Sequence, residues 1–524
     1  MIVNRIWLLC LILFSTAGMA AQNNAFDIME YQIEGNTLLS ERQIDQAVYP
    51  HLGEHKTIDD VELARSALEL AYHDAGYLTV LVNIPEQTVA GGIVRLNVVA
   101  GSIEKVRVVG SRYYSLGRIL AQAPQLAPGS VPYFPALQEE LAALNRDPVN
   151  LKVTPVLRAG STPGTVAADL KVDDQLPVHT SIELDNYNSP DTDPLRLSGM
   201  VRYDNLWQLQ HSLSLTYQMS PQNLSQVKVL SGTYLIPLPA DEQLVFYSVI
   251  SRSNVVATAG DTTIFGTGEI VGTRWIKPLP SRGQYFQTLT MGADYKNFDN
   301  NVSIAGSNAS NTPLAYVPFS VDYSGNTSDD VSATQGNLTL NFKLRGPGDK
   351  TVLCHGQTLN QFACDRYMAQ SEYIYLRGGV NTTHVLPLGM SVYAKVDGQV
   401  SNGPLITNEE FTAGGEISVR GYYEAEAAAD NGVHSTMELR GPQWTAWGLT
   451  HLTMLAFYDA AALSVIDPLA LQTSRFILES VGLGLRTDMR KFSMMLDLAW
   501  PLKNDLPYTQ AGSWHLGFKT LYAF

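Results

Sequence analysis

The stretch 411–422 combines a fixed positive charge with glycines and apolar residues, although it lies between two segments that alternate as β-strands. The residues that stand out are Gly414, Gly415, Val419, Arg420, Gly421 and Tyr422. An exposed connection between strands is normally polar, so this composition predicts a loop that packs against another surface. A guanidinium offers a rigid fork of N–H donors that suits a carboxylate. The chemistry expected here is charge-assisted recognition between side chains.

Asp459 is the carboxylate that we expect to meet Arg420. Phe457, Asp459 and Ala461 alternate along a predicted strand downstream of the loop, so they share one face. An aspartate that faced lipid would be costly, and this face is therefore expected to line the lumen of a barrel. The alternative is that Arg420 and Asp459 are unpaired charges in the lumen.

Motifs of the common catalytic classes are absent from the sequence. It contains no G-x-x-x-x-G-K-[ST] loop, no H-E-x-x-H and no G-x-S-x-G, patterns that accompany phosphate binding, zinc proteolysis and serine hydrolysis. We therefore expect a protein that is not an enzyme, with no catalytic residue and no cofactor.

Two of the three cysteines lie close together outside the N-terminal segment. Cys354 and Cys364 fall in a segment with the composition of a loop, whereas Cys10 lies in the N-terminal leader. Exported chains meet an oxidising compartment, so a disulfide is expected. A metal site that includes His355 is the alternative, but no second His or Cys cluster follows nearby, and we predict no metal.

Residues 1–20 have the pattern of a secretory signal peptide. Arg5 supplies the positive charge, residues 6–14 form a short apolar core, and Gly18 and Ala20 are the small residues that precede a cleavage site. The alternative is an uncleaved anchor, although a spanning helix needs ~20 apolar residues.

The composition favours a barrel in a membrane. The rest of the sequence has no apolar stretch long enough to cross a bilayer as a helix. A mean hydropathy of −0.03 with 16% charged residues fits strands whose apolar side chains alternate with polar ones. The net charge of −15 argues against a nucleic-acid partner.

The region 26–174 repeats one pattern twice. Each unit of about 75 residues, 26–100 and 101–174, has the order strand, helix, helix, strand, strand. A helix stripe in the first unit consists of Val61, Ala64, Leu68, Ala71 and Tyr72. A small sheet covered by two helices is typical of a binding module, and its edge strand can accept an extended peptide.

From 179 to 524 a two-residue alternation replaces the helical spacing. Leu338, Leu340 and Phe342, for example, alternate with polar residues. Short turns alternate with long loops, and the segments predict about 16 antiparallel strands in a transmembrane barrel. The chain ends on a strand with aromatic positions at Trp514, Phe518, Tyr522 and Phe524.

These features together resemble one family. The turns at 35–39 and 74–77 resemble those of POTRA domains, and the run 419–422 resembles the signature loop of POTRA-bearing outer-membrane transporters. In particular, the chain resembles the two-partner-secretion transporters for haemolysins and filamentous haemagglutinins. The final strand resembles the signal recognised by the outer-membrane assembly machinery. The implied fold is two α+β POTRA repeats followed by an all-β barrel.

The resemblance also implies roles for residues. The family pairs the loop arginine with the aspartate of a Phe-x-Asp-x-Gly strand, and this chain differs by having Ala461 in place of the glycine. The strand that contains Gly482, Gly484 and Arg486 resembles another family strand that faces the same space.

The implied function is the export of a large β-rich exoprotein, captured by periplasmic POTRA domains and passed through a barrel in the bacterial outer membrane. The implied partners are that exoprotein, the assembly machinery and the lipid bilayer. Some relatives carry an N-terminal plug helix, which we do not expect here. The alternatives are an assembly factor that inserts other barrels, and a passive porin.

Overall fold

A computed structural model describes residues 25–146, 149–190, 192–253, 256–259, 262–299, 313–346, 349–354, 357–446, 450–504 and 506–524. The predicted signal peptide, 1–20, lies outside these residues. The chain divides into two compact units on either side of the Leu176–Pro177 bond. Each unit is described by itself. No helix among the described residues is long and apolar enough to span a bilayer.

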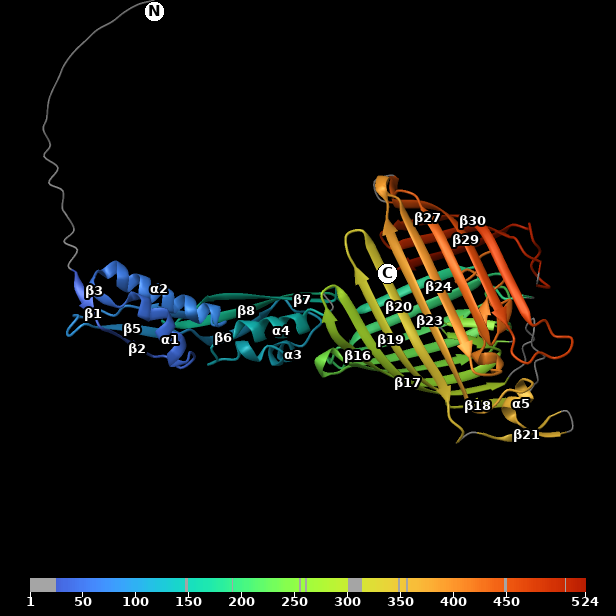
Figure 1. Ribbon diagram of the computed structural model, residues 1–524, viewed down its shortest axis with the longest axis horizontal. Coiled ribbons are helices and arrows are strands. Elements are labelled where there is room, and N and C mark those ends of the chain that lie inside the picture. Colours follow the sequence, from blue (N-terminus) through green and yellow to red (C-terminus); the bar gives the residue numbers. More distant parts are fainter. Residues whose placement is uncertain are drawn as a thin grey trace, which may run out of the picture. The chain divides into compact units, whose positions relative to one another are not determined.

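The first domain of the N-terminal unit packs two helices on one sheet (Figure 1). Its elements are β1 (Phe26–Ile28), β2 (Glu30–Glu34), α1 (Glu41–Val48), β3 (Gly53–Lys56), α2 (Ile58–Asp74), β4 (Val80–Asn83) and β5 (Ile93–Ala100). The main sheet has the order β2-β5-β4. Helix α2 begins with a capping box between Thr57 and Asp60. It buries the predicted stripe, with Leu68 and Tyr72 fully enclosed.

Two stretches with the pattern of a single strand are only partly strand in the structure. Residues 27–33 alternate between polar and apolar side chains, but they are split at Met29, because β1 pairs with β3 whereas β2 pairs with β5. In the mainly apolar stretch 77–84, β4 begins only at Val80. The backbone N–H of Tyr77 instead donates to the carbonyl of Tyr72, which extends the end of α2 past Gly76.

The second domain has the same core order of one strand, two helices and two strands, and its described residues contain no counterpart of β1 and β3. Its elements are β6 (Ser102–Val109), α3 (Leu116–Ala121), α4 (Phe134–Leu144), β7 (Leu151–Ala159) and β8 (Thr165–Asp174), with the sheet order β6-β8-β7. The two domains meet at a packed joint. The rings of Tyr77 and Tyr133 lie 5.4 Å apart, and Phe134 N–H donates to the carbonyl of Gly76 at 2.9 Å.

The C-terminal unit is a closed antiparallel barrel. Its strands are β9 (Val178–Asp185), β10 (Arg196–Leu206), β11 (His211–Met219), β12 (Lys228–Pro237), β13 (Gln243–Ser251), β16 (Thr267–Arg282), β17 (Tyr285–Asp299), β18 (Pro313–Tyr316), β19 (Phe319–Ser328), β20 (Ser332–Lys343), β23 (Tyr373–Val385), β24 (Ser391–Ser401), β27 (Asn431–Arg440), β28 (Trp444–Ala446), β29 (Thr450–Ser464), β30 (Arg475–Met489), β31 (Phe492–Pro501) and β32 (His515–Ala523).

Two of the barrel strands are each divided into two segments. Segments β18 and β19 both pair with β17 and together form one strand, and segments β27 and β28 both pair with β29 and form another. Eighteen segments, with two strands divided in this way, give sixteen strands in the described part of the chain. The predicted fold class is confirmed.

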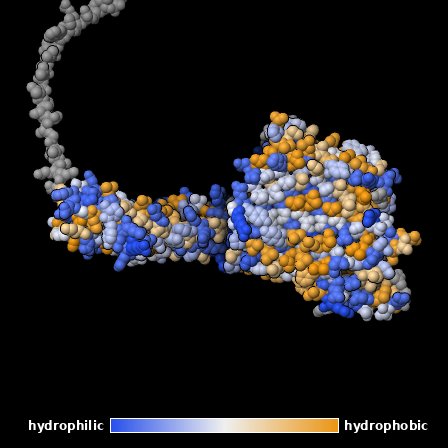
Figure 2. All heavy atoms as spheres, viewed as in Figure 1, coloured by the Kyte–Doolittle hydropathy of each residue, from blue (hydrophilic) through white to orange (hydrophobic). Residues whose placement is uncertain are grey.

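Side chains on the barrel strands alternate between the outer wall and the lumen. Leu338 and Leu340 point outward and are exposed, as are Leu215, Tyr217 and Val396. Figure 2 shows such hydrophobic residues spread over the outer wall of the barrel. An outer wall of this kind suits lipid rather than water.

The barrel closes where β32 pairs with β9. Only five residue pairs join these strands, from Lys519↔Asp185 to Ala523↔Ser181. The side chain of Asn186 extends this pairing, because its amide donates to the carbonyl of Leu516 at 2.7 Å and accepts from Phe518 N–H at 2.7 Å. Most other neighbouring strands share eight or more pairs.

Strand β9 is the first strand of the barrel in the sequence. The end of the barrel at which β9 begins, near Val178, is called the near end, and the end at which it finishes, near Asp185, is called the far end. Long connections gather there, including 344–372, 402–430 and 465–474. They contain small elements: β14 (Val256–Ala259), β15 (Thr262–Phe265), β21 (Thr351–Cys354), β22 (Gln357–Asn360), α5 (Gln361–Asp365), β25 (Phe411–Ala413) and β26 (Ala427–Ala429).

The buried stripe of α2 yields a stability prediction. Replacing Leu68 by Ala removes a side chain with no exposed surface, which costs about 2–5 kcal/mol of unfolding free energy. Leu70→Ala is the matched control, because Leu70 lies on the same helix and is 57% exposed. Pulse proteolysis of the full chain in urea measures both. Equal midpoints for the two variants would contradict the observed orientation of α2.

Candidate functional site: a loop held in the barrel lumen

The predicted signature residues lie in the connection between β24 and β27, residues 402–430, here called the lumen loop. Within it, β25 (Phe411–Ala413) pairs with β26 (Ala427–Ala429), so these two segments form a short two-stranded hairpin. Its tip turns sharply at Gly414 and Gly415, whose φ angles are +108° and +95°. A Cβ atom on Gly414 would lie 2.4 Å from the carbonyl oxygen of Tyr423, so only glycine fits this turn.

The apolar side of the lumen loop packs against the inner wall of the barrel. Val419 is completely buried. It belongs to a cluster that joins loop residues to side chains of β29 and β30: Phe411, Ala413, Tyr422, Ala427, Ala429, Ala461, Leu463, Phe476 and Leu478. Ala461, the position at which the chain departs from the family pattern, therefore contributes its methyl group to this apolar contact.

The structure brings Arg420 and Asp459 together. Arg420 Nε lies 2.7 Å from Asp459 Oδ2, and Nη2 lies 2.9 Å from Oδ1. The backbone N–H of Arg420 also donates to Oδ2, at 3.2 Å. Arg420 is 4% exposed and Asp459 is fully buried. A forked pair of this kind combines strength with directional specificity.

Further groups complete the surroundings of the guanidinium. Nη1 of Arg420 donates to Glu438 Oε1 at 2.8 Å, and the ring centroid of Phe457 lies 3.5 Å from the guanidinium carbon. Asp497 lies 3.6 Å from Nη1. Glu438 also pairs with Arg440, and Asp497 pairs with Arg486. The network thus balances three arginines with three carboxylates, drawn from the loop and from β27, β29, β30 and β31.

Glycines on β30 make room for this arrangement. A Cβ on Gly482 would lie 2.2 Å from the ring of Phe457, and one on Gly484 would lie 2.5 Å from the carboxylate of Asp497. The strand that resembles a family strand, with Gly482, Gly484 and Arg486, therefore lines the same space as Arg420.

Gly421 and Tyr422 fix the loop beyond Arg420. Gly421 has a φ of +91° and faces Ala499 and Pro501 of β31. The hydroxyl of Tyr422 lies within hydrogen-bond distance of the carbonyl oxygens of Glu479 and Lys503, at 3.2 and 3.3 Å, either of which can accept its proton. Each of the six predicted loop residues thus has a structural role in the turn or in a contact with the barrel wall.

The chemistry of this site is positional. Arginine stays protonated at any physiological pH, so the guanidinium cannot serve as an acid or a base. The described residues contain no group of His, Cys, Asp and Glu side chains that could hold a metal ion. What the arrangement can do is hold a loop in the lumen by interactions that have a defined geometry.

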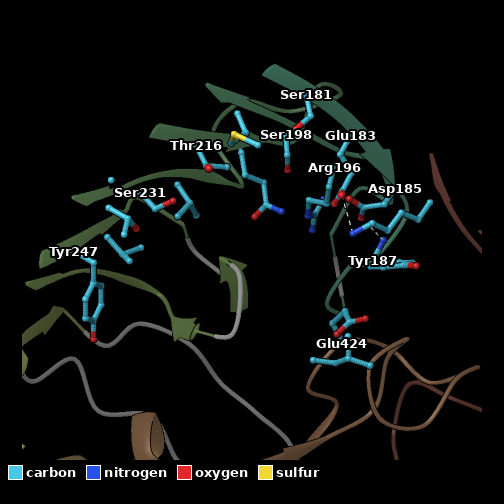
Figure 3. Close-up of a pocket in the computed structure, with 18 of the residues that line it drawn as sticks. Ser181, Glu183, Asp185, Tyr187, Arg196, Ser198, Thr216, Ser231, Tyr247 and Glu424 are labelled. Atoms are coloured by element: carbon cyan, nitrogen blue, oxygen red, sulfur yellow. Dashed lines mark hydrogen bonds and ion pairs between the residues drawn. The ribbon is translucent and has the colours of Figure 1, made fainter. Parts of the chain in front are cut away.

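The lumen loop leaves space on the opposite side of the barrel. A cavity of about 630 Å³ lies between the tip of the loop and the wall formed by β9 to β13 (Figure 3). Ile417 and Glu424 border it from the loop. Small hydroxyl side chains line this wall, and charged side chains lie among them. The hydroxyl side chains are those of Ser181, Ser198, Thr216, Ser231 and Thr233, and the charged ones are those of Glu183, Asp185, Arg196 and Lys519. The side of the lumen that the loop leaves open is therefore polar, with both hydroxyl and charged groups.

The other predicted residues lie at the far end and on the outer wall. Cys354 and Cys364 form a disulfide between β21 and α5. His355, the residue of the alternative metal site, lies outside the described residues. Trp514, Tyr522 and Phe524 are exposed and Phe518 is half-buried, and the rings of Tyr522 and Phe524 lie 4.9 Å apart.

Sequence reasoning missed two carboxylates of the site. Glu438 lies on β27 in alternation with His434 and Thr436, which also face inward. This alternation could have predicted that Glu438 faces the lumen. Asp497 lies on β31 and is buried. Neither residue has a local motif that ties it to Arg420, because the contact depends on how distant strands are ordered around the barrel.

Comparison with known proteins decides the family. The family described as "Haemolysin secretion/activation protein ShlB/FhaC/HecB" matches residues 164–487, and a ShlB-type POTRA domain matches residues 26–101. The chain belongs to the ShlB/FhaC/HecB family. Members of this family are outer-membrane transporters of two-partner secretion, with periplasmic POTRA domains, which confirms the predicted family and location.

Individual relatives agree with the family assignment. The outer membrane transporter CdiB of Dickeya dadantii (strain 3937) is 22% identical over 92% of this chain and 84% of its own length. The structure of CdiB from Escherichia coli aligns with a TM-score of 0.59 at 18% identity, covering 98% of this chain and 93% of that one. BamA from Haemophilus ducreyi lacking POTRA domains 1–3 aligns with a TM-score of 0.55 at 13% identity, over 95% of this chain and 100% of that one. At these identities the two structures show a shared fold.

The contacts of Arg420 predict the position of the loop tip. Arg420→Ala removes the cation that pairs with the buried Asp459, a loss that costs about 3–5 kcal/mol for a buried pair. We expect the tip to leave its seat, so that a spin label at position 417 becomes mobile. Arg202→Ala is the control, because Arg202 is also a barrel arginine paired with a carboxylate, Asp204 at 3.0 Å, but it lies on β10, outside the network around Arg420. A label as immobile in Arg420→Ala as in the parent would refute the role of Arg420.

Proposed function

We propose that this chain exports a large secreted β-rich partner, of haemolysin or adhesin type, across the outer membrane. The POTRA domains bind the unfolded partner in the periplasm, and the barrel passes it outward. Folding of the partner at the cell surface then draws the remainder through. Membership of a two-partner-secretion family supports the direction of transport and the class of cargo.

The observation that carries this proposal is how the tip of the lumen loop is attached to the barrel wall. The tip is held by side-chain contacts of Arg420 and Val419 with the wall, and in the described part of the chain it adds no strand to the barrel sheet. A segment held in this way can leave as a unit while the barrel stays closed. Its departure would join the space that it fills to the cavity of about 630 Å³ beside it.

The open wall of β9 to β13 suits a polypeptide in transit. An extended chain exposes backbone N–H and C=O groups, which need hydrogen-bonding partners wherever bulk water is scarce. Serine and threonine hydroxyls both donate and accept, so they can serve any sequence. These hydroxyl groups therefore offer polar contacts without demanding particular cargo side chains, and charged residues such as Glu183 and Arg196 lie beside them.

Two further partners belong to the proposal. The aromatic side chains of the last strand point outward, with Tyr522 and Phe524 exposed, which suits recognition by the outer-membrane assembly machinery before insertion and contact with lipid afterwards. Similarity to BamA keeps an assembly factor as the second candidate function. A passive porin is disfavoured by the loop that fills one side of the lumen.

Export by variants of Arg420 tests the proposal. We expect Arg420→Ala to lower the amount of partner in the medium or on the cell surface by about tenfold, a factor that corresponds to about 1.4 kcal/mol. The reason is that a tip without its place on the wall, while its base stays attached, lies across the path instead of leaving it as a unit. Cells that produce the chain together with a large candidate exoprotein provide the assay. Heat-modifiable mobility of the barrel on gels checks assembly, and Arg202→Ala serves as the control.

Two results would contradict the proposal in different ways. Normal export by a normally assembled Arg420→Ala barrel would exclude a role for the loop. Unchanged export after deletion of the whole chain, together with a general fall in other barrel proteins, would identify an assembly factor instead.

A further inference from the structure

A second buried arginine lies at the far end of the barrel, and the signature motif does not include it. Arg366 follows α5 and is 8% exposed. Its guanidinium contacts both carboxylate oxygens of Asp430, with Nη2 at 2.8 Å from Oδ2. It also donates to the carbonyl oxygens of Leu405 and Ile466, at 2.8 and 3.2 Å, and lies 3.3 Å from Glu410.

These contacts join three separate connections. Arg366 belongs to 344–372, Leu405 and Asp430 to the two ends of the lumen loop, and Ile466 to 465–474. Asp430 has no exposed surface. Besides the guanidinium, it accepts hydrogen bonds from the backbone N–H groups of Leu405 at 2.7 Å and Ile466 at 2.6 Å. Arg366 and Asp430 therefore hold the base of the lumen loop, as Arg420 and Asp459 hold its tip.

The segment that carries Arg366 is packed on the barrel rim. Phe362 is fully buried, with its ring 5.8 Å from that of Tyr316 on β18. Gln361 donates to the carbonyl of Ala315 at 3.0 Å, and Lys343 lies over the Phe362 ring. The Cys354–Cys364 disulfide ties β21 to α5. Figure 1 shows α5 and β21 together at the end of the barrel, beside β18. Residues 349–354 and 357–372 are called the cap.

The base of the lumen loop has another polar anchor next to the cap. Glu409 is 3% exposed and accepts hydrogen bonds from Lys296 at 2.6 Å, Tyr316 at 2.6 Å and Tyr375 at 2.7 Å. These partners lie on β17, β18 and β23, so this anchor fastens the loop to the wall itself. Tyr316 also contacts Phe362 of the cap. Tyr316 therefore contacts both the cap and the base of the lumen loop.

We propose that the cap keeps the transporter closed by holding the base of the lumen loop through Arg366, so that the path opens fully only when the Arg366–Asp430 contact breaks together with the Arg420–Asp459 contact. This inference rests on the proposed export function and adds a second positioning residue to it. A cargo that displaces only the tip leaves the base in place. The cap makes release of the loop depend on a change at the outer surface as well as in the lumen.

Single-channel recording of the purified full-length chain in planar lipid bilayers tests this inference. Arg366→Gln keeps a polar side chain but removes the ionic contact with Asp430. We expect the time spent in large openings to rise about tenfold, within the range of typical coupling between two sites. Arg345→Gln is the matched control, because Arg345 lies in the same connection and is exposed. It should behave as the parent does.

A double variant separates the ion pair from a general loosening of the cap. Asp430→Asn alone leaves Arg366 without its carboxylate, whereas Arg366→Gln with Asp430→Asn removes both charges. We expect the double variant to differ from the parent by less than the two single effects combined, since interacting residues are not additive. Strict additivity would overturn the direct pairing on which the inference depends.

The recordings also distinguish failure of this inference from failure of the export proposal. If assembled Arg366→Gln opens no more often than the parent, the cap does not hold the loop closed, whatever the export assay shows. If this variant does not assemble, the parent protein after reduction of the Cys354–Cys364 disulfide decides instead. Increased opening after reduction supports the cap, and unchanged opening refutes it. Neither measurement requires cargo.

Discussion

A guanidinium removed from water inside a barrel is the constraint on which the rest of the site depends. Arg420 requires carboxylates at fixed positions, because a buried cation without partners is very costly. Asp459 and Glu438 meet this need only while β27 and β29 keep their register, in which Thr436 lies opposite Asp459. A slip of one residue would turn these carboxylates toward lipid. The loop and the wall therefore specify each other.

The lumen is organised as two contrasting sides. Three arginines and three carboxylates occupy the side of β27 to β31, and their mutual contacts hold the tip of the lumen loop. On the side of β9 to β13, hydroxyl side chains face the cavity together with charged ones, among them Glu183, Arg196 and Lys519. The contacts that hold the loop and the groups that face the open space thus belong to different strands. One segment is firmly placed beside a space that is lined with polar groups.

Local pattern explains what could be predicted from the sequence. The stripe through Leu68 and Tyr72 and the alternation around Asp459 depend only on neighbours in the chain, so the helix and the inward face of the strand followed from them. Glu438 needed the order of strands around the barrel as well. Arg366 could not be predicted, because it lies in a connection without a period and meets Asp430 across 64 positions of sequence. Its partners are set entirely by how loops pack together.

The short pairing between β9 and β32 has a consequence for how the barrel is made. These strands stand at opposite ends of the barrel sequence, so their contact can form only after every strand between them is in place, and contacts between distant segments are slow to form. Until then both strands present unpaired edges, which invite pairing with other chains. The β9–β32 contact is therefore the seam at which the ring closes, and these two edges are the ones that must be kept from other chains until it does.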